Sequence, residues 1–239
     1  FLSVFLYFGF IFLMSDMITI RAGIASGLFF LSIFFINDKK NKKVAVLFCI
    51  ALLFHYSSVI CLFIYVLLYR KISYKTLLIM SLFAVVIAVG KIDIINLIGL
   101  GRLFPKIEMY NEIQRKGGVD QLNLFNFRIL FSIFIIIIFS VHYKKLRALP
   151  HFDNLFKTHF ISVILFFVFS TLNMTFSIRT FEFLTIVQLI LFPYLVNIFP
   201  KKIRFIPYFI LIAYGIAQYY YLIDYSKIFN TYESWLFKF

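Results

Sequence analysis

Charged residues are scarce in this chain, and that scarcity already restricts its class. Lys, Arg, Asp and Glu together make up 14% of 239 residues, whereas hydrophobic residues make up 63%. A soluble domain carries about 25% charged residues and 45–50% apolar ones. A water-soluble fold of this length could not bury 35 phenylalanines, because its surface-to-volume ratio limits the core. The composition therefore excludes a soluble globular domain and predicts an integral membrane protein.

Cysteines are few, and familiar catalytic signatures are absent from the sequence. Cys49 and Cys61 lie inside apolar runs, as small buried hydrophobes do, and indicate neither a disulfide nor a metal site. We find no phosphate-binding loop and no serine-hydrolase, zinc-protease or CxxC motif. The four histidines do not cluster, and His142, His151 and His159 fall in or near basic loops. We therefore expect no metal and no cofactor, so a phosphate-handling site would rely on arginines.

What the chain does contain is a succession of apolar runs separated by short basic loops. This pattern predicts an all-α, polytopic bundle of transmembrane helices that forms a single domain over residues 1–239. Because Phe1 lies inside the first run, we interpret the chain as the C-terminal part of a longer protein. The runs cover residues 1–14, 18–36, 44–68, 76–90, 125–143, 158–175, 180–199 and 203–222.

The net charge of +14 is concentrated in the loops, as in membrane proteins, and does not indicate nucleic-acid binding. If residues 44–68 form one helix, the basic groups on either side of it face opposite sides of the membrane, and the two sides have almost equal charge. If that run breaks near His55, every basic loop shares one side, with a charge of +12 against +2. The positive-inside rule selects the broken hairpin and makes the loop 91–124 external.

The two arms of this hairpin are short. Each has about a dozen residues and spans roughly 18 Å at 1.5 Å per residue. The hydrocarbon core of a bilayer is ~30 Å thick. We therefore expect a short broken or re-entrant hairpin whose tip lies below the outer surface, with His55 facing a cavity.

Two places near the external face could carry chemistry. Arg21 opens a helix in which Gly23 and Gly27 form a small-residue face that lets another helix approach. Its alternative role is to extend to the membrane interface as an anchor. His55 lies at the helix break beside Ser57. An ionisable side chain at membrane depth is a functional candidate, and the alternative is a hydrogen-bonded structural histidine.

Two further candidates follow later in the chain. Arg179 and Glu182 are about one helical turn apart, so they can pair, either in a site or as an ion pair that stabilises packing. The loop 91–124 is long for a chain with otherwise short loops, and such connections are often functional. Its candidate substrate-binding residues are Arg102, Tyr110 and Arg115.

Four stretches carry a family resemblance. Residues 20–25 (IRAGIA), the lysine-rich turn after them and residues 53–58 (LFHYSS) resemble the EpsG family of Wzy-like polysaccharide polymerases. Residues 178–183 (IRTFEF) are similar to that family's second arginine helix. The resemblance implies a multi-pass glycosyltransferase of the bacterial inner membrane. It would polymerise undecaprenyl-diphosphate-linked repeat units on the outer face into an O-antigen, a capsule or an exopolysaccharide.

The resemblance also suggests roles for individual residues, which are our hypothesis. Arg21 and Arg179 would stabilise charge on the diphosphate leaving group. His55 or Glu182 would accept the proton of the attacking sugar hydroxyl, and Ser57 would contact substrate. The expected partners are the lipid-linked glycan, the bilayer, and a flippase and a chain-length regulator of the same pathway. A flippase is the alternative from another class, although it should carry charged groups through the depth of several helices. An O-antigen ligase would use the same donor.

Overall fold

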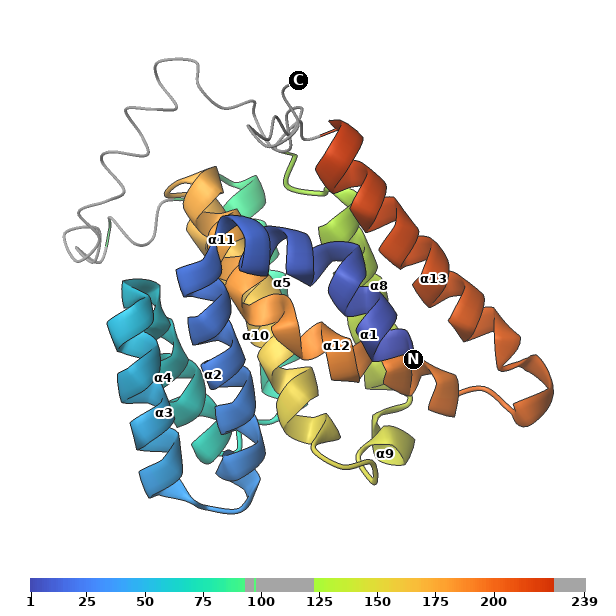
Figure 1. Cartoon of the computed structure of the whole chain (residues 1–239), viewed down its shortest axis with the longest axis horizontal. Helices are drawn as coiled ribbons and strands as arrows, with labels where there is room; N and C mark the ends of the chain where they lie inside the picture. The colour runs from blue at the N-terminus through green and yellow to red at the C-terminus, as the bar shows by residue number, and fades with distance from the viewer. Residues whose placement is uncertain (93–96, 98–122, 226–239) are drawn as a thin grey trace, which may run out of the picture.

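The computed structural model describes residues 1–92, 97 and 123–225, and within these ranges the chain is helical with short turns and no strands (Figure 1). This confirms the all-α prediction. Arg102, Tyr110 and Arg115 lie outside the described residues. The main helices are α1 (Leu2–Leu6) continuing into η1 (Tyr7–Ile18), α2 (Ile20–Asn37), α3 (Asn41–Phe54), α4 (Val59–Tyr69), α5 (Tyr74–Val89), α8 (Phe127–Val141), α9 (Tyr143–Leu146), α10 (Phe152–Ser170), α11 (Met174–Leu184), η4 (Thr185–Val187), α12 (Gln188–Leu191), η5 (Phe192–Asn197) and α13 (Phe205–Tyr220).

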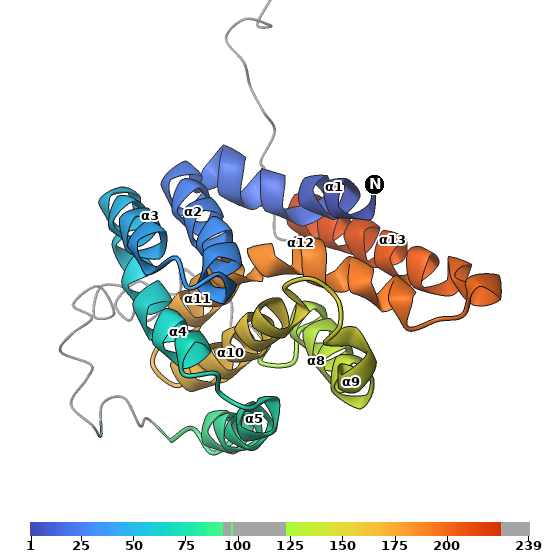
Figure 2. The same cartoon turned by 90° about the horizontal axis from the view of Figure 1, so that it is seen from below.

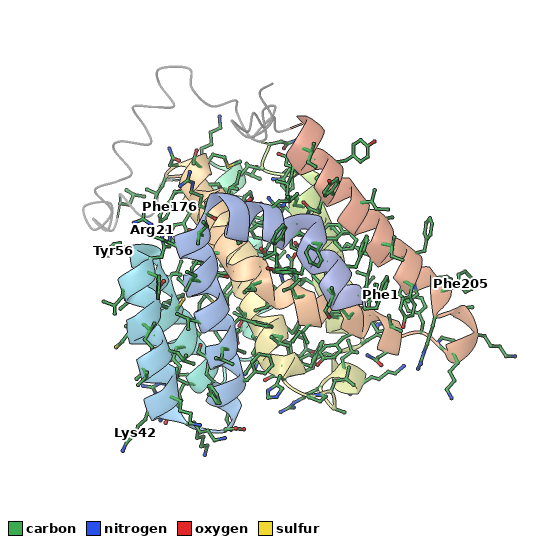
Figure 3. All side chains as sticks on the ribbon, viewed as in Figure 1. Phe1, Arg21, Lys42, Tyr56, Phe176 and Phe205 are labelled. Atoms are coloured by element: carbon green, nitrogen blue, oxygen red, sulfur yellow. The ribbon has the colours of Figure 1, made fainter. Side chains whose placement is uncertain are left out.

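The apolar run 44–68 breaks where the charge argument predicts. His55 follows α3 with an extended backbone (φ −150°, ψ 116°), and the short turn η2 (Tyr56–Ser58) leads into α4. The Ser58 hydroxyl donates to the carbonyl of Ala51 at 3.2 Å, which holds the turn against the end of α3. Figure 3 shows Tyr56 at one end of this pair of helices and Lys42 at the other. The broken hairpin is therefore confirmed.

Contacts between loops show that the basic loops meet at one end of the bundle. The rings of Phe34 and His151 lie 4.8 Å apart, and those of Tyr74 and Tyr143 stack at 4.2 Å. The Lys145 ammonium donates to a backbone carbonyl just beyond η5 at 3.1 Å. These contacts join the end of α2, the start of α5, the α8–α10 connection and the end of η5. We call this the basic end of the bundle.

A polar cluster at the basic end makes α10 start earlier than the sequence predicts. The Tyr143 hydroxyl and the Lys157 ammonium both donate to Asp153, the latter at 2.7 Å. Burial and the hydrogen bond to Asp153 raise the pKa of Tyr143, so its hydroxyl keeps the proton that it donates. The polar groups of Tyr143, Asp153 and Lys157 therefore have hydrogen-bond partners at this depth, and the helix begins at Phe152. The expectation that His159 lies in or near a loop was wrong, since it is fully buried in α10.

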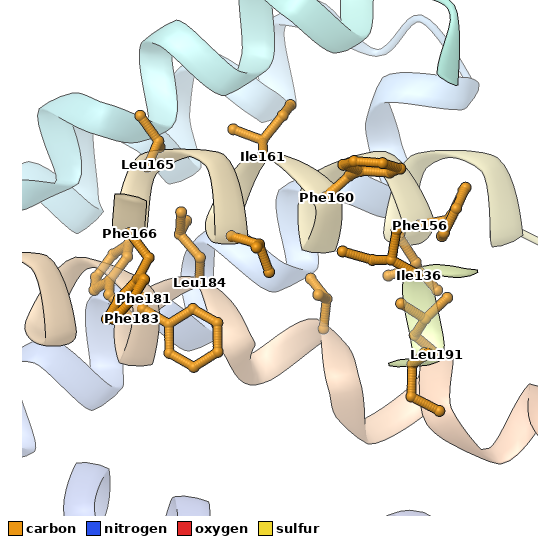
Figure 4. Close-up of a cluster of buried hydrophobic side chains, with 14 of the residues drawn as sticks. Ile136, Phe156, Phe160, Ile161, Leu165, Phe166, Phe181, Phe183, Leu184 and Leu191 are labelled. Atoms are coloured by element: carbon orange, nitrogen blue, oxygen red, sulfur yellow. The ribbon is translucent and has the colours of Figure 1, made fainter. Parts of the chain in front are cut away.

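Helix α10 lies at the centre of the bundle and contacts α5, α8 and α11 (Figure 2). Figure 4 shows Phe166 of α10 beside Phe181 of α11 in the buried core, with Phe160 further along α10 next to Phe156. Within the described residues, three helical stretches are long and apolar enough to cross a membrane. They are Phe152–Ser170, Met174–Asn197 and Lys201–Ile223, and shorter apolar helices accompany them.

The two glycines of α2 have different surroundings. A Cβ atom added to Gly23 would lie 2.6 Å from the carbonyl oxygen of Ser15 in η1. At Gly27 no atom would lie within 4 Å of such a Cβ. The predicted close approach therefore holds for Gly23, where η1 turns back against α2. Gly27 borders open space.

Candidate active site

Helix α11 brings together elements that are far apart in the sequence. The Phe183 ring lies 6.1 Å from that of His55, with an interplanar angle of 25°, and 6.3 Å from that of Phe29 on α2. The buried Ser26 hydroxyl of α2 donates to the Phe183 carbonyl at 2.8 Å. The helix that opens with Arg21 and the turn that holds His55 therefore meet at one point on α11.

The neighbouring residue on α11 reaches another element. Glu182 Oε1 accepts a hydrogen bond from Arg128 Nη1 of α8 at 2.6 Å, and the two side chains are only 19% and 11% exposed. The Asn126 side chain caps α8 and accepts from the backbone N–H groups of Arg128 and Ile129 at 3.1 Å. This cap fixes the start of the helix next to Arg128. The ion pair therefore ties the beginning of α8 to the last turn of α11.

This pairing differs from the one that sequence spacing suggests. The partner of Glu182 in the ion pair is Arg128, 54 residues away, and not Arg179 on the same helix. Arg128 was missed by the sequence analysis. A signal was present, because a cation inside the apolar run 125–143 is rare and is by default a functional candidate.

The two predicted arginines lie on the surface of the described structure. Arg21 is the second residue of α2 and is exposed, as predicted for the end of a helix. Arg179 is also exposed, but it lies within α11 and not at its start. The Asn173 side chain caps α11 by accepting from the N–H of Phe176 at 3.2 Å, so the helix begins at Met174. Residues 176–179, which lie between the predicted apolar runs 158–175 and 180–199, are therefore part of α11.

These elements share the end of the bundle that lies opposite the basic end. Figure 3 labels Arg21, Tyr56 and Phe176 there, while Lys42 lies at the far end. We call this region the arginine end. The arrangement places three predicted elements together: the start of α2, the His55 turn and the first turns of α11.

The remaining candidates can be placed in part. Ser57 belongs to the turn η2 at the arginine end, and its side chain is not described. His55 is half-buried against Phe183, whereas Glu182 Oε1 is already occupied by the Arg128 guanidinium. One of the two carboxylate oxygens of the predicted base Glu182 is therefore already engaged. Across the described ranges, no three His, Cys, Asp or Glu side chains gather as a metal site would.

The fold and the site together define a helical membrane protein in which the Arg21 helix, the His55 turn and the Arg179 helix share one end of the bundle. The chain belongs to the EpsG family, whose sequence pattern matches residues 1–236. This family places it among the membrane proteins of polysaccharide biosynthesis. No curated protein and no solved structure matches the chain.

Proposed function

We propose that this chain is a membrane glycosyltransferase that polymerises undecaprenyl-diphosphate-linked repeat units into a surface polysaccharide. The observation that carries the proposal is the meeting of the Arg21 helix, the His55 turn and the Arg179 helix at the arginine end. By the positive-inside rule the basic end is cytoplasmic. The arginine end then faces the outer side of a bacterial inner membrane that the chain crosses several times.

The proposed reaction exchanges one bond for another. A hydroxyl of the incoming lipid-linked unit attacks the anomeric carbon of the growing chain, and the bond from that carbon to the diphosphate oxygen breaks. The diphosphate leaves on its lipid, while His55 takes the proton of the attacking hydroxyl. Arg21 and Arg179 stabilise the charge that develops on the leaving group. Ser57 and the loop residues Arg102, Tyr110 and Arg115 contact the glycan.

Lysine substitution of the two arginines tests this assignment. Lysine keeps the positive charge but loses the planar fork of donors that grips a phosphate at two points. Losing one charge-assisted contact of ~1.5–3 kcal/mol in the transition state slows turnover by roughly 10- to 100-fold. We therefore expect Arg21→Lys and Arg179→Lys to insert normally and to make little polymer. The measurement is polymer formation from purified lipid-linked repeat units, followed by gel electrophoresis.

Arg70→Lys provides a matched control, because Arg70 is exposed at the basic end. It should make as much polymer as the unsubstituted chain. If Arg21→Lys and Arg179→Lys are both fully active, the arginines do not recognise diphosphate through two contacts and instead anchor the helices at the interface.

The same preparation separates this function from the alternatives. A polymerase joins repeat units in detergent micelles. A flippase shows no activity there, because it moves lipids between the two leaflets of a bilayer and a micelle has none. The polymer made by a polymerase stays attached to undecaprenyl diphosphate, whereas a ligase transfers it to a different acceptor lipid. Polymer that forms in micelles and remains acid-labile at its diphosphate would support the proposal. Glycan transfer to another acceptor without chain growth would contradict it.

A further inference from the structure

A largely apolar groove runs between α2, α3 and α4. Its volume is about 270 Å³. Helix α3 packs closely along α2, and the residues that line the groove come from these two helices and from α4. The Ser32 hydroxyl in its wall donates to the carbonyl of Phe29 within the same helix at 2.6 Å. The lining residues used below are Ala45, Cys49, Ala51, Cys61 and Leu62.

The groove lies directly beneath the turn that holds His55. The carbonyl of Ala51, a lining residue, accepts hydrogen bonds from the His55 N–H at 2.9 Å and from the Ser58 hydroxyl at 3.2 Å. The other end of the groove reaches Asn41 at the start of α3. The groove therefore extends from the candidate active site toward the basic end, along the direction that a lipid chain follows in a membrane.

The rim of the groove is open on the side of α3 and α4. Cys49 and Leu62 line it and are exposed, while Cys61 and Ala51 form its buried wall. A lipid chain could thus enter sideways from the bilayer without crossing water. A sugar or a diphosphate would not suit this lining, because burying a polar group without hydrogen-bond partners is costly. The occupant that fits both the apolar lining and the polar end is an amphipathic lipid.

We propose that this groove binds the prenyl chain of the lipid-linked substrate and so places its diphosphate at the His55 turn. The proposal rests on the proposed function, because that function supplies a lipid with a diphosphate head. Bilayer lipid is as apolar as the groove, so moving the chain into it gains little from the hydrophobic effect. The groove would mainly orient the substrate, while selectivity would come from the diphosphate.

Photo-crosslinking at position 62 tests the groove directly. A benzophenone side chain replaces Leu62, which is 50% exposed and lines the groove, or Leu82 on α5, which is 63% exposed and does not line it. Both variants are placed in liposomes with ³²P-labelled undecaprenyl diphosphate and irradiated. We expect several-fold more label on the variant at position 62, and loss of that label when unlabelled undecaprenyl diphosphate is added. Undecaprenol, which lacks the diphosphate, should compete much less well.

A second variant fills the groove without touching the arginine end. Ala45→Phe adds a ring at an exposed lining position and should lower crosslinking at position 62 but not at position 82. Equal labelling at positions 62 and 82 would overturn the proposal in favour of ordinary bilayer lipid. Protein–protein crosslinks at position 62 would overturn it in favour of a helix as the occupant.

The crosslink reports lipid binding without turnover, so the two proposals can fail separately. A chain that makes polymer but gives no selective crosslink at position 62 would overturn the groove alone. A chain that crosslinks selectively but makes no polymer in micelles would overturn the proposed function and keep the groove as a lipid site.

Discussion

The buried ion pair between Arg128 and Glu182 should make single and double substitutions behave very differently. The charged atoms lie 2.6 Å apart, and the two side chains are only 11% and 19% exposed. Replacing Arg128 alone by methionine leaves a carboxylate with no counter-charge in a largely desolvated place, at a cost of about 3–5 kcal/mol. Replacing both residues by methionine removes the two charges together. That change is often neutral or even stabilising.

A double-mutant cycle measures the difference. The free energy of unfolding is compared for the unsubstituted chain, Arg128→Met, Glu182→Met and the double variant, with SDS titration in mixed micelles. We expect a coupling of at least ~2 kcal/mol, since residues joined in one ion pair are not additive. The ion pair between Lys40 and Asp38 is the matched control. Its charged atoms lie 2.7 Å apart, close to the 2.6 Å of the Arg128–Glu182 pair, but both of its side chains are nearly half exposed. Removing either member of it should leave stability unchanged.

Three outcomes would refute this reasoning or extend it. If the double variant loses as much stability as the two single variants combined, the pair does not link α8 to α11. If the double variant is stable and still makes polymer, Glu182 is not the catalytic base, as its contact with Arg128 already suggests. A stable double variant that makes no polymer would instead place one of these two side chains in the chemistry.

Three further predictions concern the topology, the long loop and the glycines. In a cysteine-free background, cysteines at Lys42 and Ser73 should be labelled by an impermeant maleimide from the same, cytoplasmic side; labelling from opposite sides would contradict the hairpin. Replacing residues 110–121 with a Gly/Ser linker should abolish polymer while the protein stays in the membrane, and normal polymer would reduce the loop to a tether. Gly23→Leu should destabilise the protein by about 1–3 kcal/mol because of the close Ser15 carbonyl, whereas Gly27→Leu should have little effect. If Gly23→Leu and Gly27→Leu lower the thermal unfolding temperature equally, η1 moves aside to accommodate the new side chain and the prediction is wrong.

Physical constraints explain why so much of the fold could be predicted. Lipid offers no hydrogen-bond partner to the backbone, so long apolar runs must become helices. The distribution of lysines and arginines then distinguished one long helix over 44–68 from the broken hairpin. The starts of α10 and α11 were harder to predict, because local polar contacts extend these helices beyond the apolar runs. Asp153 pairs with Lys157 in one case, and the Asn173 side chain caps the helix in the other.

The candidate site was predictable only in part. Arg21, His55 and Arg179 stood out because ionisable residues are rare in such a sequence. Arg128 was overlooked because its partner is 54 residues away, whereas Arg179 offered Glu182 a partner at ordinary helical spacing. Pairing between helices depends on packing that a single sequence does not reveal. The roles of Arg102, Tyr110 and Arg115 remain predictions outside the described residues.

The adjacency of Glu182 and Phe183 also has a genetic consequence. Successive residues of an α-helix point about 100° apart, since a turn has 3.6 residues. Glu182 therefore points toward Arg128, whereas its neighbour Phe183 contacts His55 and α2. A codon inserted between residues 179 and 182 would turn Arg179 by that angle relative to both contacts and shift it along the axis. Insertions between residues 179 and 182 should abolish polymer formation, whereas the same insertion after residue 197, beyond η5, should leave it intact.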